Sequence, residues 1–417
     1  MKLVTTTALA LVAAFAAAPA AAQYGAAAQQ QQTAAQAAPA KQAAPQIKPS
    51  AKALKAIVDL QDAVKKNDFA NVPAKVAAAK AVASTKEDRY LVGKLQLDAA
   101  RAANDNAALV AAIDTIAGSG YLDTEKVGGL YQDVGGIFFN AKQFPQAAAA
   151  YQKAIAIDSR NGEASRMLGI TLFEQGQKSE AAAALQKYIQ TSSAAGQKPT
   201  EDTYRIAVQS AFDAKLPEAS GLARQWLEAY PSADSWRNSI AVYRNLNQPD
   251  TEGTLDLLRL MQATGSLATP GDYELYAASA ADQSNYNEAQ AIVDAGLNAK
   301  VLDPANATVR EILANLKTKN KATVADLETA EKTAQNPKAY IRIGDSYSAM
   351  GQFAKAAEVY RKAIGKPGVD QNVANLHLGM ALARAGDKSG AAAALNAVTG
   401  PNADIAKFWL TYVNRKA

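Results

Sequence analysis

The stretch KQFPQAAAAYQKAI at residues 142–155 decides the fold, because a near copy of it, GQFAKAAEVYRKAI, occupies residues 351–364. The two copies place Phe, Ala, Tyr, Ala and Ile at the same offsets. In the first copy, Ala147, Tyr151 and Ala154 are spaced by four and three residues, which puts them on one face of an α-helix. The repetition predicts that one helix-packing joint is used at two places in the chain.

A fixed period links this stretch to its neighbours. Tyr131 and Gly135 lie on one face of a preceding helix, and the same pattern returns downstream with Gly169 and Ala181. The steps from Gly135 to Gly169 and from Ala147 to Ala181 are both 34 residues long. A period of this length is typical of solenoids built from stacked helix pairs.

One unit shows the pattern most completely. It spans residues 337–370, and its pattern residues are Tyr340, Ile343, Gly344, Tyr347, Gly351, Ala356, Tyr360 and Ala363. An aromatic residue, a Leu-Gly type pair and a second aromatic residue on one helix, followed by Ala-x-x-x-aromatic on the next, resemble the tetratricopeptide repeat family. Units 128–161, 162–195 and 372–400 resemble it in the same way.

The resemblance implies an all-α fold, a right-handed α-solenoid of about ten antiparallel helix pairs followed by a C-terminal capping helix. The expected parts are a signal peptide, a disordered leader rich in Gln, Ala and Pro, degenerate helix pairs, the repeats and the cap, at residues 1–22, 23–50, 51–127, 128–400 and 401–417. Within the repeats, the less regular helix pairs are expected at residues 200–233, 234–267, 270–303 and 306–336.

Small residues are expected to shape the joints between helices. We expect Gly344 on a first helix to face Ala356 on the second, so that the two backbones approach closely. Gly351 and Gly386 follow helix ends, where a left-handed backbone conformation is favoured. Asp387 is expected to cap the free N–H groups of the helix that follows it.

The N-terminus has the features of an export signal. A positive charge at Lys2 precedes an apolar run at residues 8–18, and three alanines at residues 20–22 precede Gln23, the expected first mature residue. A transmembrane anchor is the alternative, but the run is shorter than the roughly 20 residues that a span needs. The chain has no cysteine, which excludes disulfides and a lipoprotein anchor. We therefore expect a periplasmic protein of bacterial type.

The search for catalytic motifs finds little. The single histidine, His377, is expected to pack on a repeat helix, and neither a nucleophile elbow nor a phosphate-binding loop is present. Acidic residues such as Glu174, Glu180 and Asp282 are expected on solvated faces or turns. We predict no catalytic, cofactor-binding or metal-binding residue. A net charge of +5 with interspersed signs gives no nucleic-acid signature.

A partner groove is implied by the resemblance, along the first helices of the repeats. Matching the family's groove positions to this chain gives Phe139, Asn140, Arg166, Phe173, Tyr204, Phe212 and Arg384 as the predicted groove, with Asp345, Ser348, Leu376 and Met380 among the further positions. The Lys and Asn positions with which some family members hold a peptide carboxylate are not reproduced. The alternative for Phe139 and Phe173 is packing between repeats, which also uses large residues.

The resulting hypothesis is a non-catalytic scaffold or adaptor that binds protein partners in the bacterial periplasm, in envelope biogenesis. It predicts no nucleic-acid partner and no membrane span in the mature chain. One alternative is a peptidoglycan- or polysaccharide-related enzyme or accessory factor carried on a helical solenoid. A second is a structural solenoid that forms homo-oligomers through its leader, residues 23–50, or through Trp409 in the cap.

Overall fold

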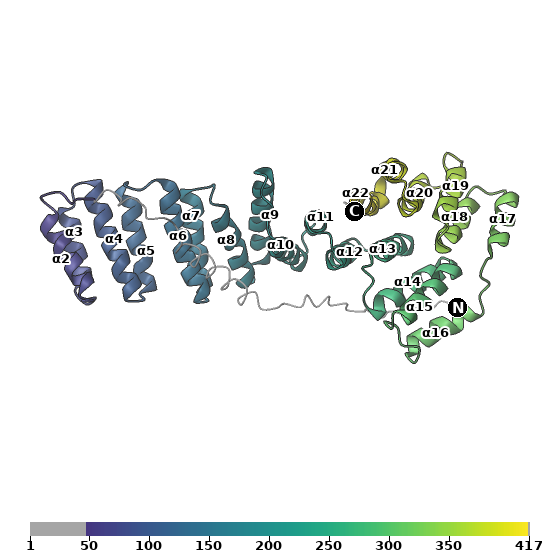
Figure 1. Ribbon diagram of the computed structural model, residues 1–417, viewed down its shortest axis with the longest axis horizontal. Helices are drawn as coiled ribbons and strands as arrows, with labels where there is room; N and C mark the ends of the chain where they lie inside the picture. The colour runs from purple at the N-terminus through teal and green to yellow at the C-terminus, as the bar shows by residue number, and fades with distance from the viewer. Residues whose placement is uncertain (1–46, 416–417) are drawn as a thin grey trace, which may run out of the picture. The chain divides into compact units, whose positions relative to one another are not determined.

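The described residues of the computed structural model run from 47 to 415, and every regular element among them is helical (Figure 1). They form 21 α-helices and one short 3₁₀ helix. The expected all-α, solenoid-like stack of helix pairs is confirmed. The predicted signal peptide, and all but the last few residues of the predicted leader, lie outside the described residues.

The chain divides into two compact units, with unit 1 ending at Leu216 and unit 2 beginning at Pro217. The helices of unit 1 are α2 (Leu54–Lys65), α3 (Val72–Val82), α4 (Lys86–Ala102), α5 (Asn106–Ser119), α6 (Thr124–Asn140), α7 (Phe144–Ile157), α8 (Gly162–Glu174), α9 (Lys178–Ala194) and α10 (Glu201–Asp213). From α2 to α9 they pack as consecutive pairs, and α10 packs against α9 and α8. Figure 1 shows these pairs side by side in chain order.

Side-chain caps set the helix starts in unit 1. At the start of α4, the Thr85 hydroxyl accepts the N–H of Asp88 at 3.0 Å, and the Asp88 carboxylate accepts the N–H of Thr85 at 3.2 Å. The N–H and hydroxyl of Ser50 also donate to Asp88, at 2.7 and 2.8 Å. Burial opposes ionisation of Asp88, but these bonds lower its pKa to about 2. The carboxylate thus ties the first described residues to α4.

A glycine and a large side chain form the joint inside each well-matched pair. A Cβ atom on Gly135 would lie 2.6 Å from the Tyr151 ring, and one on Gly169 would lie 2.5 Å from Leu185. In unit 2, Gly344 meets Tyr360 in the same way, so its nearest contact is one helical turn beyond the expected Ala356. The glycine makes room for a large side chain of the second helix to lie flat on the first.

The helices of unit 2 do not all pair as predicted. They are α11 (Ala219–Ala229), α12 (Ala233–Asn247), α13 (Thr251–Thr264), α14 (Pro270–Asp282), α15 (Tyr286–Asn298), α16 (Ala307–Lys317), α17 (Val324–Thr333), α18 (Ala339–Ala349), α19 (Phe353–Ala363), α20 (Gln371–Ala385), α21 (Lys388–Asn396) and α22 (Ala403–Asn414). α11 packs chiefly against α12. α16 packs against α14 and α15, whereas α17 packs against α18, so residues 306–336 do not form a hairpin of their own.

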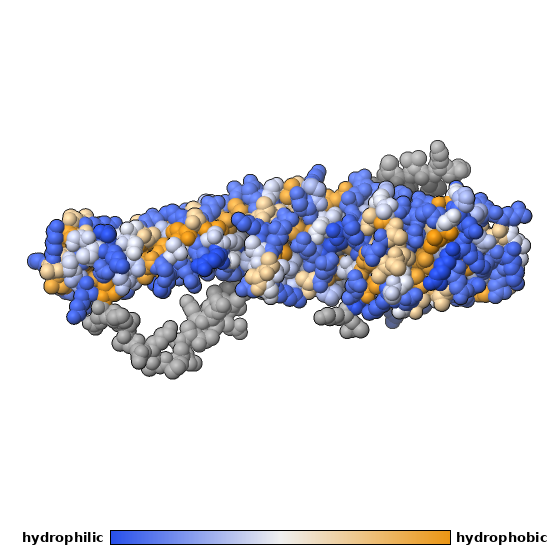
Figure 2. Space-filling model, turned by 90° about the horizontal axis from the view of Figure 1, so that it is seen from above, coloured by the Kyte–Doolittle hydropathy of each residue, from blue (hydrophilic) through white to orange (hydrophobic). Residues whose placement is uncertain are grey.

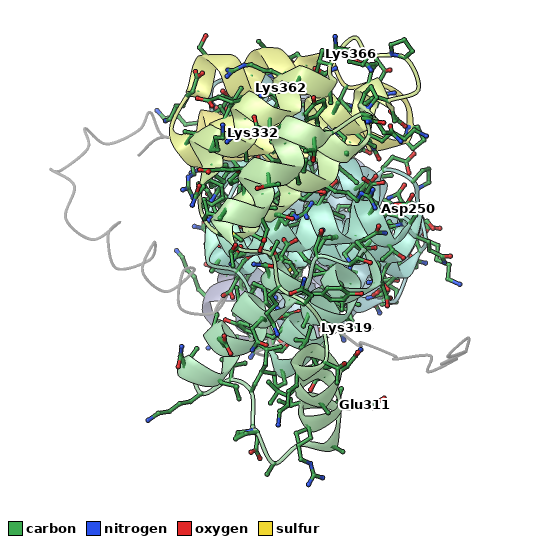
Figure 3. All side chains as sticks on the ribbon, turned by 90° about the vertical axis from the view of Figure 1, so that its right-hand side faces the viewer. Asp250, Glu311, Lys319, Lys332, Lys362 and Lys366 are labelled. Carbon is green, nitrogen blue, oxygen red and sulfur yellow. The ribbon has the colours of Figure 1, made fainter. Side chains whose placement is uncertain are left out.

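Helix α17 has no glycine joint with a partner helix, and ion pairs connect it to α19 instead. The Glu331 carboxylate, only 9% exposed, pairs with Lys355 on α19 at 3.3 Å and also with Lys362. Figure 3 shows Lys362 and Lys332, the neighbour of Glu331, on the same side of the unit. Charge pairs therefore replace the small-to-large contact that the sequence of α17 does not offer.

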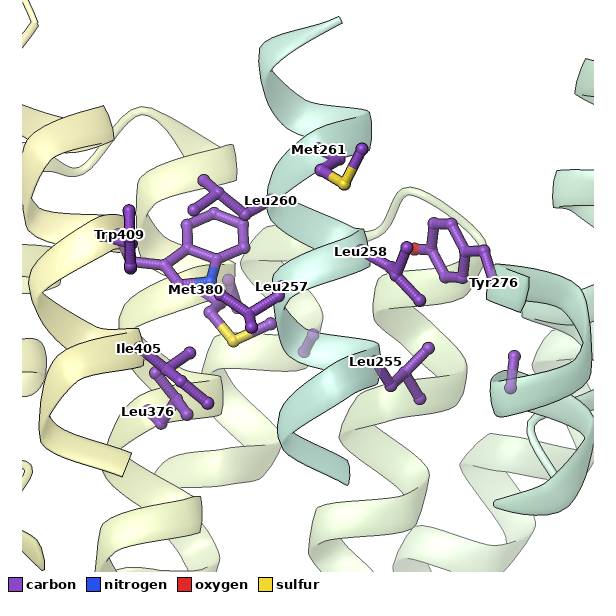
Figure 4. Packing of buried hydrophobic residues seen from close by; sticks show 14 of the residues in the cluster. Leu255, Leu257, Leu258, Leu260, Met261, Tyr276, Leu376, Met380, Ile405 and Trp409 are labelled. Carbon is purple, nitrogen blue, oxygen red and sulfur yellow. The ribbon is translucent and has the colours of Figure 1, made fainter. Parts of the chain in front are cut away.

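The C-terminal helix α22 does more than cap the last repeat. It packs against α21 and α20, and also against α13 from the beginning of the unit. Trp409 is fully buried, and its Nε1–H donates to the backbone carbonyl of Asp256 at 3.3 Å. Figure 4 shows Trp409 reaching from α22 toward α13, beside Leu260 and Met380. The Trp409 side chain is therefore enclosed within unit 2 and is not itself available for self-association, whereas oligomers formed through the rest of the cap stay a prediction.

Candidate functional site

Six of the seven predicted groove residues lie on the first helices of unit 1. Helix α8 packs against both α6 and α10, so these side chains come from neighbouring helices. They differ in exposure: Asn140 is exposed, and Phe173 and Phe212 are partly buried, whereas Phe139 and Tyr204 are buried, at 9% and 5% exposed. The Arg166 guanidinium donates to Glu163 one turn earlier, at 2.6 and 2.9 Å. The groove itself stays a prediction.

The two aromatic residues with an alternative role lie at equivalent joints. The Phe139 ring packs edge-on against Phe144, with centroids 5.5 Å apart. At the next joint, Lys178 replaces Phe144, and its ammonium lies 3.4 Å from the centroid of Phe173. Phe173 is only partly buried, whereas Phe139 is 9% exposed. Phe173 therefore offers more contact area to a partner than Phe139.

The seventh residue, Arg384, lines a cavity inside unit 2. This central cavity has a volume of about 210 Å³ and lies among α13, α14, α15, α18, α19, α20 and α22. Exposed Gln262 and Gly351 lie at its open end, and buried His377 lies at its inner end. The predicted groove positions Ser348 and Met380 also line it, and Asp345 and Leu376 are buried. In unit 2 these positions therefore face the interior of the unit.

Buried His377 lies between two carboxylates from distant helices. Its Nδ1 is 2.9 Å from Asp345 on α18, and its Nε2 is 3.3 Å from Asp256 on α13. Burial alone would lower the pKa of His377, but the two carboxylates raise it well above its ordinary value. Burial likewise opposes ionisation of Asp345, yet the charge of His377 lowers the pKa of that carboxyl to about 2. The imidazole is therefore a buried cation.

A second buried ion pair adjoins this group. Arg259 donates two parallel hydrogen bonds to Glu288, at 2.8 and 2.7 Å, and a third to Asp256 at 2.8 Å. The Tyr276 hydroxyl donates to Glu288 at 2.9 Å, and the Tyr360 hydroxyl donates to Asp345 at 2.7 Å. Breaking such a pair is costly, because the remaining charge stays buried without a partner.

The acidic members of this network were not predicted from the sequence. Acidic side chains were expected on solvated surfaces, which is correct for Glu174 and Glu180 but not for Asp256 and Glu288, which are 1% and 6% exposed. The signal was the run TLDLLRLM at residues 254–261, where an acid and an arginine three residues apart interrupt a leucine-rich helix. A charged pair inside an apolar run points to a buried ion pair.

Other features of the described residues are quickly stated. No helix within residues 47–415 is both long and apolar enough to cross a membrane. In the same part of the chain, no group of His, Asp and Glu side chains is arranged to hold a metal ion. Figure 2 shows hydrophobic side chains reaching the surface in bands between hydrophilic ones.

Stacked helix pairs joined through a glycine and a large side chain define a helical-repeat protein. Within that class, two segments of the chain, residues 137–197 and 341–404, match the model of the tetratricopeptide repeat family. These segments contain the joints of Gly169 with Leu185 and of Gly344 with Tyr360. No curated protein matches the chain.

Several solved structures match the chain at low sequence identity. The structure of Naa15/Naa10 bound to HypK-THB matches at 10% identity with a TM-score of 0.41, covering 82% of this chain and 63% of that one. This chain thus spans less than two thirds of that relative. PilF of Pseudomonas aeruginosa matches at 11% identity and a TM-score of 0.26, covering 63% and 97%. A tetratricopeptide repeat protein of Parabacteroides merdae matches at 12% identity and a TM-score of 0.25, covering 79% and 99%.

Proposed function

We propose that this protein is a non-catalytic adaptor of the bacterial periplasm, acting in envelope biogenesis, which binds a partner protein on unit 1. The proposed surface is the first-helix face, defined by Asn140, Arg166, Phe173 and Phe212. The observation that supports it is that Phe173 and Phe212, on helices α8 and α10 that pack together, both remain partly exposed. Aromatic and arginine side chains dominate the energetics of protein interfaces.

Affinity capture from an envelope extract tests the surface. The full chain should retain a defined set of proteins, and the double variant Phe173→Ala with Phe212→Ala should lose them. Tyr188→Ala is the matched control, because Tyr188 is a partly buried aromatic residue on the second helix α9. Each variant must first show the wild-type helical circular-dichroism spectrum. Equal capture by the double variant and the wild type would reject the first-helix face.

Export is tested separately. The proposal rests on the charge, apolar run and small residues at positions 2–22, which lie outside the described residues. Fractionation of a bacterium that produces the full chain should recover it in the periplasm, and N-terminal sequencing should begin at Gln23. Recovery in the cytoplasm with Met1 retained would contradict the periplasmic part of the proposal without affecting the partner surface.

The non-catalytic part of the proposal has its own test. Incubation of the purified protein with cell-wall sacculi should release no soluble muropeptides above the buffer control. Release of muropeptides that persists after further purification would instead favour the enzymatic alternative, a peptidoglycan-acting protein carried on a helical solenoid. The buried carboxylates Asp256, Glu288 and Asp345 are already paired with His377 or Arg259, which leaves none of them free to act as a general acid.

A further inference from the structure

The central cavity of unit 2 presents an excess of positive charge. Three cationic side chains line it, Arg259, His377 and Arg384, against one carboxylate, Glu288. Asp256 and Asp345, which pair with His377, do not line the cavity. The cavity wall is therefore complementary to an anion, although the buried network as a whole is close to balanced.

Arg384 is the cation of the cavity that has no acidic partner among the described residues. Its guanidinium carbon lies 4.4 Å from the centroid of the Phe353 ring, and no carboxylate pairs with it. Arg259, in contrast, is bound to both Glu288 and Asp256. A guanidinium stacked on an aromatic ring keeps its N–H groups directed to the side, where they match a carboxylate.

The inner end of the cavity holds a second donor without a well-aligned partner. His377 is 2% exposed, and neither of its ring nitrogens makes a hydrogen bond of good geometry, although both lie near carboxylates. His377 and Arg384 are seven residues apart on α20, so they face the cavity from the same side, about 10 Å apart along the helix. Both ends of the cavity therefore carry positive charge.

Between these ends the cavity wall is mainly apolar. Ile292, Met380 and Trp409 line it, together with small alanines. A volume of about 210 Å³ is larger than the roughly 150 Å³ that accommodates a benzene molecule in an engineered protein cavity. The space therefore suits a ring-sized apolar group with one carboxylate.

We propose that the central cavity binds a small organic acid, with its carboxylate on Arg384 and its apolar body against Met380 and Trp409. This site is separate from the first-helix face proposed above, and neither proposal depends on the other. A free acid and the C-terminal residue of a peptide present the same chemistry. The free acid is the occupant proposed here, because a volume of about 210 Å³ accommodates one ring-sized group with its carboxylate and little more.

Isothermal titration calorimetry on the full chain tests this proposal with phenylacetate as the probe. Phenylacetate should bind. Phenylacetamide has the same shape without the charge, and it should bind at least about tenfold more weakly, because a charged hydrogen bond is lost. Arg384→Gln should weaken phenylacetate by a similar factor. Arg361→Gln is the matched control, since Arg361 is an exposed arginine on α19 that does not line the cavity.

Two further measurements keep the result interpretable. Ala291→Phe, at an exposed position on the cavity rim, should block phenylacetate while the protein remains folded. N-acetyl-Ala-Phe distinguishes the two sources: tighter binding than phenylacetate would identify a peptide C-terminus as the ligand of the same site. Absence of phenylacetate and peptide binding at millimolar concentrations, or equal affinity of phenylacetate for Arg384→Gln and the wild type, would overturn the proposal.

Discussion

Gly344 occupies a position where even a methyl group has no room. A Cβ atom there would meet the Tyr360 ring, whose Cδ1 would be 2.7 Å away. The ring cannot move aside freely, because its hydroxyl donates to buried Asp345. We therefore expect Gly344→Ala to lower the free energy of unfolding by about 1–3 kcal/mol, as overpacking does in other cores.

Urea denaturation measures this effect, and Gly271→Ala supplies its control. Gly271 lies in the first turn of α14, and a Cβ atom there would contact nothing within 4 Å. The control should leave stability unchanged or raise it by up to about 1 kcal/mol, because alanine favours the helix over glycine. If Gly344→Ala were as stable as Gly271→Ala, the glycine–tyrosine joint would not be the tight contact described here.

Lys142 carries backbone strain at the turn between α6 and α7. Its φ angle is +56°, and glycine occupies the equivalent turn position at Gly351, with φ +75°. Left-handed backbone costs a residue with a Cβ roughly 1–2 kcal/mol, part of which glycine's greater freedom in the unfolded chain offsets. Lys142→Gly should therefore raise the free energy of unfolding by up to about 1 kcal/mol in urea. Lys142→Ala retains the strain, so a comparable gain in that variant would contradict the explanation.

At the level of helices, the repeat period predicted the positions of the helices well. It predicted less well which helices pack together. Regular joints with glycine at one position, as in α18 with α19, were predictable because a single contact determines the pairing. α16 and α17 lack such a joint, so their partners depend on long-range contacts such as Glu331 with Lys362. Pairing that depends on side chains from distant repeats leaves no local pattern in the sequence.

At the level of helices, the packing of α22 predicts how a substitution in it changes the stability of unit 2. Trp409 is fully buried between α22 and α13, so Trp409→Ala should lower the free energy of unfolding of unit 2 by about 3–5 kcal/mol. Leu410→Ala, at a partly exposed neighbouring position, should cost clearly less. Denaturation followed by near-ultraviolet circular dichroism checks both. Equal losses in the two variants would show that α22 does not hold the unit through Trp409.

Across the whole molecule, the buried charge network could not be predicted because its members are distant in sequence. Asp256, Asp345 and His377 come from three helices, α13, α18 and α20, that are far apart in the sequence. The sequence predicted that His377 is packed, and the histidine is 2% exposed. It placed Arg384, Ser348 and Met380 along a partner groove, which stays a prediction, and it did not predict the cavity that these residues line, because the lining comes from seven helices distant in sequence.

The same network predicts how stability depends on pH. His377 gains its raised pKa only in the folded protein, so its contribution to stability is complete below its unfolded pKa of about 6.5 and is lost as the pH rises through the higher folded value. Asp345 acts in the opposite direction: its contribution is present above its unfolded pKa of about 3.9 and is lost as the pH falls toward about 2. The other titratable or charged groups that face this pair are Glu252, Asp256, Arg259 and Tyr360. Stability from the pair should therefore be greatest between about pH 4 and pH 6.5.

Urea denaturation of the wild type and of His377→Asn over a range of pH separates this contribution from the rest of the protein. The difference in unfolding free energy between the two should be largest in the mildly acidic range and should shrink as the pH rises into the alkaline range, because the wild-type imidazolium is then lost. Asp345→Asn should remove the acid limb of the same curve. A difference that stays constant from pH 5 to the alkaline limit would mean that the buried imidazole is neutral, and that the two carboxylates are balanced by Arg259 alone.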